Sequence, residues 1–313
     1  RQRQMCIRDR YYSAGSEAFD ELYDTGASTA DIQPGEEVSC YDLLAALLIP
    51  SSCEAANIIA LNVSDSITGF TDLMNEKAEK LGMENTHFSN AHGLWAQQNY
   101  SSCKDMATLC EYAISKYQVF RDIVCLPSYH MASTSYHSDG TDIYNTNLML
   151  DSMTDYYYSY AKGIKTGTLD SAGRCLASYA EYEGTTYLIV TMGAPMDKLE
   201  EDVKKGEEDP DSIYGGDNVY YNLLDHISLY KWAFSSLVAT DFVDKNSEVR
   251  DVKVSYGDGI DYANLKPANG FTRLWPVDIS VNDVEKKITV YDNVVAPVEV
   301  GDVLGLSLIH ISE

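Results

Sequence analysis

The sequence lacks an excess of basic residues, since its 313 residues include 23 Lys and Arg against 48 Asp and Glu, a formal net charge of -25. Surfaces that bind nucleic acid are basic, so this composition argues against a nucleic-acid partner and provides no attraction to an anionic membrane. No apolar run is long enough to span a membrane, and no signal peptide is visible. The acidic composition is typical of a secreted or surface protein, whose net charge keeps it in solution.

Cysteine spacing excludes two further classes of protein. The seven cysteines contain no Cys-x-x-Cys pair and are odd in number, which disfavours a zinc finger and a small disulfide scaffold. We expect most of them to be buried core residues. The histidines do not place two ligands on one helix face, so hydrogen bonding in loops is favoured over a zinc site. The residues weighed for such a site are His87, His92, His130, His137 and Cys103.

Both ends of the chain differ from the rest. Arg1–Arg10 (RQRQMCIRDR) is basic, and Ser307–Glu313 (SLIHISE) interrupts an emerging β pattern. Both resemble translated sequencing-adapter read-through, so residues 1–10 and 306–313 are interpreted as foreign segments and excluded from the fold prediction. On this interpretation the natural protein extends beyond the chain at both ends, where a signal peptide and a C-terminal membrane anchor would lie.

The chain is long enough for two domains, and its apolar pattern changes from helical spacing to short β runs near residues 240–247. Apolar spacing before this point predicts helices at Tyr41–Ile49, Ser51–Val63, Ile67–Leu81, Lys104–Tyr117 and Val219–Leu237. Short β runs after it lie at Val249–Tyr256, Pro276–Val281 and Lys287–Tyr291. We therefore predict an α+β domain over residues 11–240 and a small all-β domain over 246–305.

Three segments of the first domain are less regular. Tyr129–Ser135 and Asp142–Leu150 fit either strands or extended loops. The charged, Gly-containing segment Asp197–Asn218 is expected to be a mobile surface insertion.

The centre of the chain predicts a β-hairpin that follows a cationic strand. Two apolar runs, Cys175–Tyr182 and Thr186–Met192, are joined by Glu183-Gly184. Upstream, Gly163–Thr168 reads GIKTGT, which places an ammonium, a hydroxyl and a glycine in succession. An ammonium provides charge and a hydroxyl provides direction for a carboxylate, while glycine allows close approach. A solvated lysine before a turn is the plainer interpretation of the same residues.

Ser51, directly after Pro50, also has two interpretations. Ser51-Ser52-Cys53-Glu54 opens a predicted helix, and a serine with an acid in the first turn is ordinary N-terminal capping chemistry. The apolar spacing of the sequence does not decide whether Ser51 caps the helix or takes part in a reaction.

Three segments in fixed order carry a resemblance to a known family. LLIPSSCEAAN (Leu47–Asn57), MNEKAEKLGMENTHFSNAHGL (Met74–Leu94) and GIKTGTLDSAGRCL (Gly163–Leu176) closely resemble the serine-type D-alanyl-D-alanine carboxypeptidases. These are the low-molecular-mass penicillin-binding proteins of peptidase family S11, which trim peptidoglycan outside the cytoplasm. The resemblance implies a DD-peptidase/β-lactamase-like antiparallel sheet flanked by helices, a β-rich C-terminal domain, and no cofactor or metal.

The resemblance also implies roles for individual residues. The family transfers an acyl group through S-x-x-K, S-x-N and K-T-G motifs. By the match, Ser51 relays a proton to the departing D-Ala, and Lys165 supports the charge network. Thr166, next to Gly167, holds the terminal carboxylate of the peptidoglycan stem peptide, and the N–H of Thr168 provides half of the oxyanion hole. β-Lactams are the expected inhibitors of the full-length protein.

Cys53 departs from the family pattern, because it stands at the third position of S-x-N. A thiol is a poor donor and a poor acceptor compared with an amide, so positioning of the substrate by Cys53 is weakened. Cys53 as a nucleophile lacks activating partners. The substitution instead favours a second hypothesis, a homologue that binds cell-wall peptide without cutting it. A class A β-lactamase is a third, less favoured one, since no omega-type loop with a deacylating Glu is visible between Asn57 and Ile143.

The chain as printed is predicted to form no stable acyl adduct with penicillin. Its Ser-x-x-Lys segments begin at Ser101, Ser159 and Ser228, all after Ser51, whereas the family places the nucleophile before the S-x-N motif. We therefore expect the nucleophile to precede Tyr11, outside this chain. Labelling with a fluorescent β-lactam followed by peptide mapping tests this, and an adduct on Ser101, Ser159 or Ser228 would contradict it.

Overall fold

The structure, a computed structural model, describes residues 7, 9–216, 218–259 and 261–310. Its contacts divide the chain into two compact units, Arg1–Tyr230 and Lys231–Glu313, and the division falls within helix α8 (Tyr221–Ser236). The boundary predicted near residues 240–247 lies later in the chain. Strand β8 (Leu237–Val243) begins before that boundary, yet it pairs with β11 (Phe271–Pro276) of the second unit.

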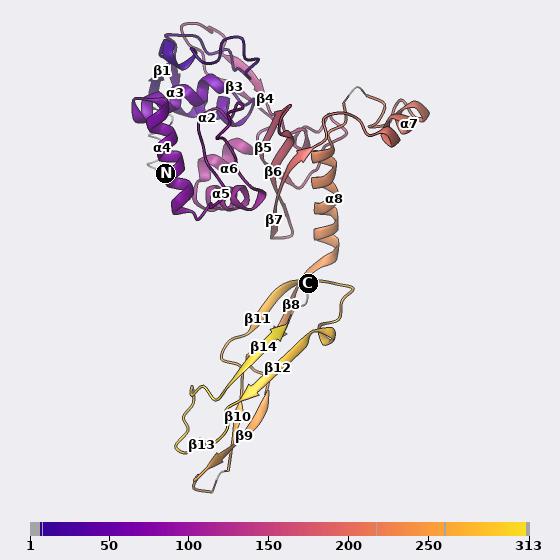
Figure 1. Cartoon of the computed structure of the whole chain (residues 1–313). Coiled ribbons are helices and arrows are strands. Elements are labelled where there is room, and N and C mark those ends of the chain that lie inside the picture. The colour runs from indigo at the N-terminus through magenta and orange to yellow at the C-terminus, as the bar shows by residue number, and fades with distance from the viewer. Residues whose placement is uncertain (1–6, 8, 217, 260, 311–313) are drawn as a thin grey trace. The chain divides into compact units, whose positions relative to one another are not determined.

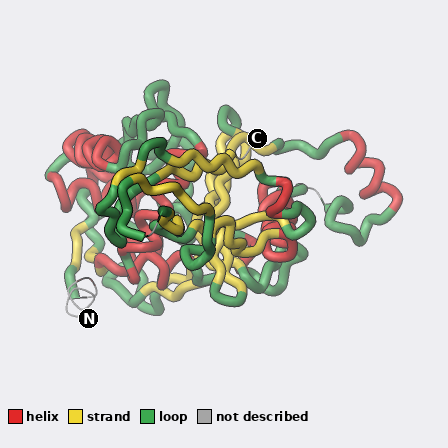
Figure 2. Tube along the Cα trace, turned by 90° about the horizontal axis from the view of Figure 1, so that it is seen from below, coloured by secondary structure: helices red, strands yellow, loops and turns green. Residues whose placement is uncertain are grey.

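The first unit consists of helices and short strands around a three-stranded sheet (Figure 1). Strands β1–β2 and β3–β4 form separate antiparallel pairs, and β5–β6–β7 form the antiparallel sheet. Figure 2 shows the loops, in green, that connect these elements. In chain order the elements are β1 (Tyr11–Ser13), η1 (Ser16–Ala18), β2 (Glu37–Ser39), α2 (Cys40–Leu48), α3 (Cys53–Ser64), α4 (Ile67–Lys80), α5 (Cys103–Lys116), α6 (Gln118–Val124), β3 (Ser128–Met131), β4 (Thr141–Tyr144), η2 (Leu148–Leu150), β5 (Ala161–Leu169), β6 (Gly173–Tyr182), β7 (Thr185–Ala194), α7 (Glu200–Glu208) and α8.

The predicted helices lie within two residues of the observed ones, because local chemistry marks their ends. Ser39 and Ser66 accept hydrogen bonds from backbone N–H groups in the first turns of α2 and α4, and Gly82, with φ +74°, follows the end of α4. The seven-residue helix α6 was not predicted, since it is too short to show a clear period. Helix α7 lies inside the acidic segment that was expected to be an insertion.

The central hairpin forms as predicted, and it leaves β5 at the edge of the sheet. Glu183 and Gly184 have φ values of 48° and 81°, the two positive φ angles of a tight hairpin turn between β6 and β7. The strand order is β5-β6-β7, and among the described residues no strand pairs with the other edge of β5. The Lys165–Thr168 segment therefore lies on an edge strand, where a peptide can add.

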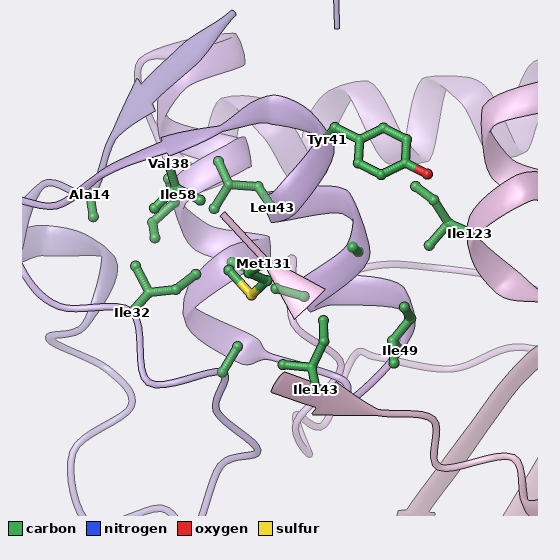
Figure 3. Close-up of a cluster of buried hydrophobic side chains, with 14 of the residues drawn as sticks. Ala14, Ile32, Val38, Tyr41, Leu43, Ile49, Ile58, Ile123, Met131 and Ile143 are labelled. Atoms are coloured by element: carbon green, nitrogen blue, oxygen red, sulfur yellow. The ribbon is translucent and has the colours of Figure 1, made fainter. Parts of the chain in front are cut away.

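The main hydrophobic core surrounds α2 and explains why its sequence is almost entirely apolar. Leu43, Ile49 and Ile58 are fully buried, and they come from α2, its C-terminal end and α3. Figure 3 shows side chains from several other segments gathered around them. Those segments contribute Ala14, Ile32, Val38, Ile123, Met131 and Ile143. A helix buried in this way has a fixed C-terminal end, and Ser51 follows that end directly.

Helices cover both faces of the sheet, as the resemblance implied. Cys110 of α5 and Val124 of α6 form one apolar cluster with Ile164 and Tyr179 of the sheet. On α8, His226 is fully buried and joined to the sheet by polar contacts. Its Nδ1 lies 2.7 Å from Ser178 Oγ, and its Nε2 lies 2.9 Å from Thr191 Oγ1.

The second unit is built from strands, as predicted, with a small core of Val252, Val254 and Val294. The prediction of a strand at Pro276–Val281 is wrong, because the observed strand β11 ends at Pro276. Proline has no N–H with which to extend the hydrogen-bond ladder. Part of the excluded segment 306–313 belongs to β14, which pairs with β12, while 1–6, 8 and 311–313 lie outside the described residues. After β8, the elements are β9 (Arg250–Ser255), β10 (Tyr262–Leu265), β11, η3 (Val281–Asp283), β12 (Glu285–Val290), β13 (Val294–Val295) and β14 (Gly305–His310).

Buried His226 predicts a loss of stability in acid. Burial lowers its pKa from 6.5 to about 4, so the folded state disfavours the protonated ring that the unfolded chain accepts. The stabilisation is present above pH 6.5 and is lost as the pH falls toward 4, by about 3 kcal/mol in all. Urea unfolding at pH 7 and pH 4.5 should show a steeper decline for the native chain than for His226→Asn. The matched substitution of exposed His130 should leave the decline unchanged, and equal slopes for the native chain and His226→Asn would contradict the assignment.

Candidate active site

Ser51 lies in the short connection between α2 and α3, and it is not the helix cap. The cap is Ser52, whose Oγ accepts a hydrogen bond from Ala55 N at 3.1 Å and whose own N–H donates to Ala46 O at 2.9 Å. Ser51 has φ +70°, a conformation that is uncommon for a residue with a side chain. Because Ser52 serves as the cap, the hydroxyl of Ser51 is available for other contacts.

The Lys165 ammonium on β5 donates a hydrogen bond to the Ser51 hydroxyl, and this contact joins residues 114 positions apart in the sequence. The same ammonium donates to the carbonyl oxygen of Thr166 at 3.0 Å. Burial lowers the pKa of Lys165 from 10.5 to about 8, against an opposing effect of the Cys53 thiol. A lysine in this range can exchange protons with a neighbouring hydroxyl near neutral pH.

Cys53, two residues beyond Ser51, is a buried thiol. The side chain is 4% exposed, and its Sγ lies 3.8 Å from the carbonyl oxygen of Ser51. Burial, and then the charge of Glu54, raises the pKa of the thiol, which disfavours the thiolate that a nucleophilic cysteine requires. Its backbone N–H donates to Ser28 O at 2.9 Å, so the start of α3 is joined to the preceding loop.

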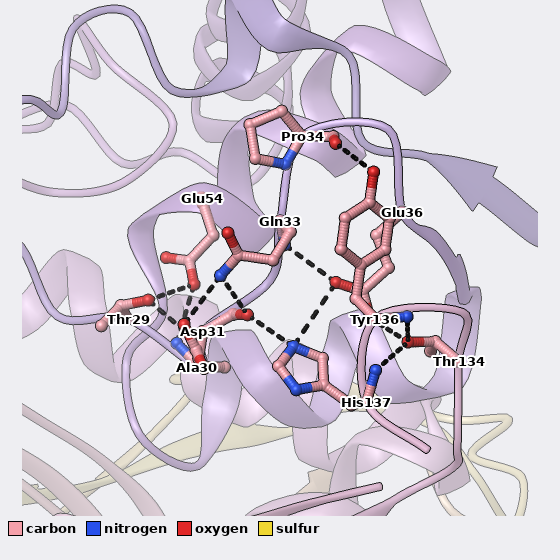
Figure 4. A network of polar contacts seen from close by, with 10 residues as sticks. All are labelled: Thr29, Ala30, Asp31, Gln33, Pro34, Glu36, Glu54, Thr134, Tyr136 and His137. Atoms are coloured by element: carbon pink, nitrogen blue, oxygen red, sulfur yellow. Dashed lines mark hydrogen bonds and ion pairs between the residues drawn. The ribbon is translucent and has the colours of Figure 1, made fainter.

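Two buried carboxylates hold that loop, and no sequence pattern predicted this role for either of them. Figure 4 shows Glu54 Oε1 accepting hydrogen bonds from Thr29 Oγ1 and Ala30 N, both at 2.7 Å. Glu36 accepts from Gln33 N at 2.8 Å and from Thr134 Oγ1 at 2.5 Å. Each carboxylate is 3% exposed or less. Together these bonds fix the loop against which the Ser51–Cys53 turn is placed.

Thr146 is a further residue at the site that was missed. Its Oγ1 lies 2.6 Å from Thr166 Oγ1, and its N–H donates to Ile49 O at 3.3 Å, next to the Ser51 turn. The neighbouring asparagines hold this segment, since Asn145 Nδ2 donates to Leu126 O and Asn145 Oδ1 accepts from Asn147 N, both at 2.9 Å. Thr146 lies within Asp142–Leu150, a segment whose sequence fits either a strand or an extended loop. The pattern therefore did not indicate a functional residue there.

The remaining candidate residues continue along the edge strand. Thr166 is half-buried, whereas Gly167 and Thr168 are exposed. A Cβ placed on Gly167 would lie 4.0 Å from the nearest atom, the Cys175 Cβ, so packing against β6 does not require a glycine there. A glycine at position 167 therefore matters for the open edge of β5, because without a side chain the backbone there can be approached closely by a ligand.

The three Ser-x-x-Lys segments lie elsewhere in the chain. Ser101 Oγ is 2.8 Å from Thr86 Oγ1 at the start of α5, Ser159 precedes β5, and Ser228 is on α8. Across the described ranges, no hydrogen bond joins any of these serines to Ser51 or Lys165. The four histidines weighed for a metal site, His87, His92, His130 and His137, each form hydrogen bonds to a carboxylate or to a backbone carbonyl. No cluster of three potential metal ligands occurs in the part of the chain that the structure describes.

The candidate site combines a hydroxyl hydrogen-bonded to a lysine of lowered pKa with an open sheet edge that carries further hydroxyls, an arrangement compatible with serine–lysine acyl transfer. The chain belongs to the D-alanyl-D-alanine carboxypeptidases of peptidase family S11, the low-molecular-mass penicillin-binding proteins, whose family model matches residues 6–196. It is 28% identical to the D-alanyl-D-alanine carboxypeptidase DacF of Bacillus subtilis over 286 residues, or 90% of this chain. The chain spans 64% of the length of DacF.

Solved structures show the same fold. The D-alanyl-D-alanine carboxypeptidase DacD from Francisella tularensis matches 98% of this chain and 78% of its own, with a TM-score of 0.69 and 20% identity. The β-rich second unit is therefore part of the shared architecture. The Streptomyces K15 DD-transpeptidase matches 60% of this chain and 73% of its own, with a TM-score of 0.54 and 30% identity. Its solved variants include replacements, by alanine, of a serine and of a cysteine two positions further along.

Replacement of the two neighbouring serines is predicted to separate their roles. Ser52→Ala removes the cap of α3 and should lower the free energy of unfolding by about 1 kcal/mol. Ser51→Ala leaves the cap in place but removes the acceptor of the Lys165 ammonium, so its cost should be about 1 kcal/mol at pH 7 and should decrease above pH 8, where the lysine loses its charge. Urea unfolding of both variants at pH 7 and pH 9 measures this, and a loss in Ser51→Ala that does not change with pH would contradict the separate roles.

Proposed function

We propose that this protein acts as a serine-type D-Ala-D-Ala carboxypeptidase, which removes the terminal D-Ala of peptidoglycan stem peptides through an acyl-enzyme. The observation that carries the proposal is the Lys165–Ser51 hydrogen bond beside the edge strand that bears Thr166 and Thr168. Family membership supports the chemistry, and the stem peptide is the substrate class that the family name implies.

The residues of the site would divide the work as follows. A serine hydroxyl attacks the penultimate D-Ala carbonyl and gives up its proton, and the C–N bond breaks. Ser51 relays that proton to the departing amine, while Lys165 stabilises the transfer. The backbone N–H of Thr168 would hold the oxyanion. Thr166 and Thr146, whose hydroxyls lie 2.6 Å apart, would orient the terminal carboxylate. Water then releases the acyl group and restores the serine.

The three Ser-x-x-Lys segments do not supply the acylated serine of this mechanism. Because none of the three Ser-x-x-Lys serines contacts Lys165 or Ser51, we propose that it comes from a segment that this sequence does not contain. Ser51 itself, bound to a lysine of lowered pKa, is the alternative nucleophile that the geometry allows. Sequencing the gene on both sides of the region that encodes this chain separates the two. A β-lactam adduct on Ser51 would favour the alternative.

Cys53 was the residue that favoured a non-catalytic binder, and two observations weaken that hypothesis. The thiol is buried near the carbonyl oxygen of Ser51, and the Ser51–Lys165 contact forms in its presence. The K15 DD-transpeptidase has a serine and a cysteine at the same spacing as Ser51 and Cys53. A serine and a cysteine at this spacing therefore also occur in a similar protein that is named as a transpeptidase. The β-rich second unit and the family match also favour a carboxypeptidase over a class A β-lactamase.

The proposed location is outside the bacterial cytoplasm, where peptidoglycan is found. Within the described residues, none of the helices combines the length and the apolar character that crossing a bilayer would need. The strongly acidic composition, with a net charge of -25, agrees with a protein that works in the aqueous space of the cell wall.

Peptide binding by the chain as printed tests the proposal. NMR titration with acetyl-L-Lys-D-Ala-D-Ala should show saturable binding, and the L-Ala-L-Ala peptide should not bind. Lys165→Met should weaken binding roughly ten- to a hundredfold, because a charged hydrogen-bond donor is lost. Lys162→Met, on the same strand, serves as the matched control and should bind normally. Equal binding of the two stereoisomers would contradict the proposal, and release of D-alanine would show that catalysis accompanies binding.

A further inference from the structure

A cavity of about 380 Å³ lies at the turn of the β6–β7 hairpin, and the mechanism above does not use it. Its volume is within the range of pockets that hold small molecules. The lining comes from the hairpin turn, the strand ends beside it and one residue of β5: Lys162, Glu181, Tyr182, Glu183, Gly184 and Thr186. An aromatic ring surrounded by an ammonium, two carboxylates and a hydroxyl suits a ligand that has both an apolar face and many polar groups.

The ring of Tyr182 is held by a chain of aromatic contacts that reaches into the core. Its centroid lies 4.6 Å from that of Tyr160, and Tyr160 packs edge to face against Tyr158 at 5.5 Å. Tyr158 is in turn stacked on fully buried Tyr230, whose hydroxyl lies 2.7 Å from Ser178 Oγ. The ring that lines the cavity therefore has a fixed position, and it loses little entropy when a ligand packs on it.

An irregularity of β5 brings Lys162 to this cavity. The register of β5 against β6 shifts between Ala161 and Ile164, so Lys162 lies in a bulge. A bulge of this kind re-aims a side chain, and the Lys162 side chain lines the cavity beside the hairpin turn. The bulge therefore adds a cation to a cavity whose other charged residues are acidic.

The charged groups around the ring are available to a ligand. Neither the ammonium of Lys162 nor the carboxylate of Glu181 forms an ion pair with any residue that the structure describes. The Glu183 carboxylate accepts a hydrogen bond from the Tyr182 hydroxyl, which raises the pKa of that phenol. Access is open at the turn, because a Cβ placed on Gly184 would meet no atom within 4 Å.

A sugar ring that carries an acetamido group matches these features. The C–H groups on one face of a pyranose pack on an aromatic ring, and its hydroxyls donate to carboxylates. The acetamido group has an N–H for the Glu181 carboxylate and a carbonyl oxygen for the Lys162 ammonium. A free amino acid would match the same two charges, but it has no flat apolar face for Tyr182.

We propose that this cavity binds an N-acetylated hexosamine of the peptidoglycan glycan strand. The choice of ligand rests on the proposed function, because the stem peptides of peptidoglycan are attached to such sugars. Lys162 precedes Lys165 by three positions on β5, so the cavity lies about 10 Å along the strand from the candidate active site. The two sites can be occupied together, and binding of the glycan keeps the enzyme on the polymer between one stem peptide and the next.

NMR titration with chitotetraose, a soluble oligomer of N-acetylglucosamine, tests the inference. The native chain should show saturable shifts at residues 181–186, and maltotetraose, which lacks acetamido groups, should bind about tenfold more weakly. Tyr182→Leu should weaken the binding of chitotetraose roughly tenfold, because the flat aromatic face is lost, whereas Tyr182→Phe keeps the ring and should bind within about threefold of the native chain. Tyr23→Leu, a matched change of a tyrosine that is 69% exposed and lies outside the cavity, should bind as the native chain does.

A second variant keeps the test decisive if Tyr182→Leu does not fold. Glu181 is exposed, so Glu181→Ala leaves the packing intact and should weaken the binding of chitotetraose about three- to tenfold. An unchanged affinity in Glu181→Ala, or equal binding of maltotetraose and chitotetraose by the native chain, would overturn the inference.

The peptide titration separates this inference from the proposed function. Acetyl-L-Lys-D-Ala-D-Ala carries no sugar, so Lys162→Met should weaken the binding of chitotetraose and leave the binding of the peptide unchanged. Saturable binding of the peptide without binding of chitotetraose would overturn the inference and leave the proposed function standing. Binding of chitotetraose at residues 181–186 without binding of the peptide would support the sugar site and contradict the proposed function alone.

Discussion

The hydrogen bond between the Lys165 ammonium and the Ser51 hydroxyl connects a sheet edge to the end of a buried helix, and the proposed chemistry depends on it. Neither side chain can hold the other alone, because a lysine is flexible and a serine is short. The contact forms because α2 is fixed by the core that surrounds it and β5 by its pairing with β6. Burial of the lysine then lowers its pKa to about 8, so packing determines the acidity of the site.

The supporting contacts show how a local arrangement is built from distant segments. Ser52 takes the capping role, which leaves the Ser51 hydroxyl for Lys165. Glu54, one residue beyond Cys53, binds the loop at Thr29 and Ala30, and Cys53 N–H reaches Ser28 of the same loop. A buried carboxylate that accepts two hydrogen bonds is well compensated, so the loop is a firm support for the turn.

Local patterns predicted the helices around α2 and α4, the hairpin and the Lys-Thr-Gly strand, because caps, apolar spacing and turn residues are encoded within a few positions. They could not assign the cap between Ser51 and Ser52, since both serines have the same chemistry and only the helix start distinguishes them. Thr146 was missed for a different reason. It becomes meaningful only through its contact with Thr166, which lies on another element, and the periodicity of a sequence does not indicate such a contact.

Burial of Lys165 gives the candidate site a cation within a chain of net charge -25. Repulsion from a net charge of -25 is screened by salt over about 10 Å, so the binding of a carboxylate depends on the charges nearest to it. Lys165, with a pKa of about 8, carries most of its charge at pH 7 and loses its proton a little above that pH. The proposed acyl transfer therefore depends on an ammonium that the packing around β5 provides, and the net charge of the chain has little influence on it.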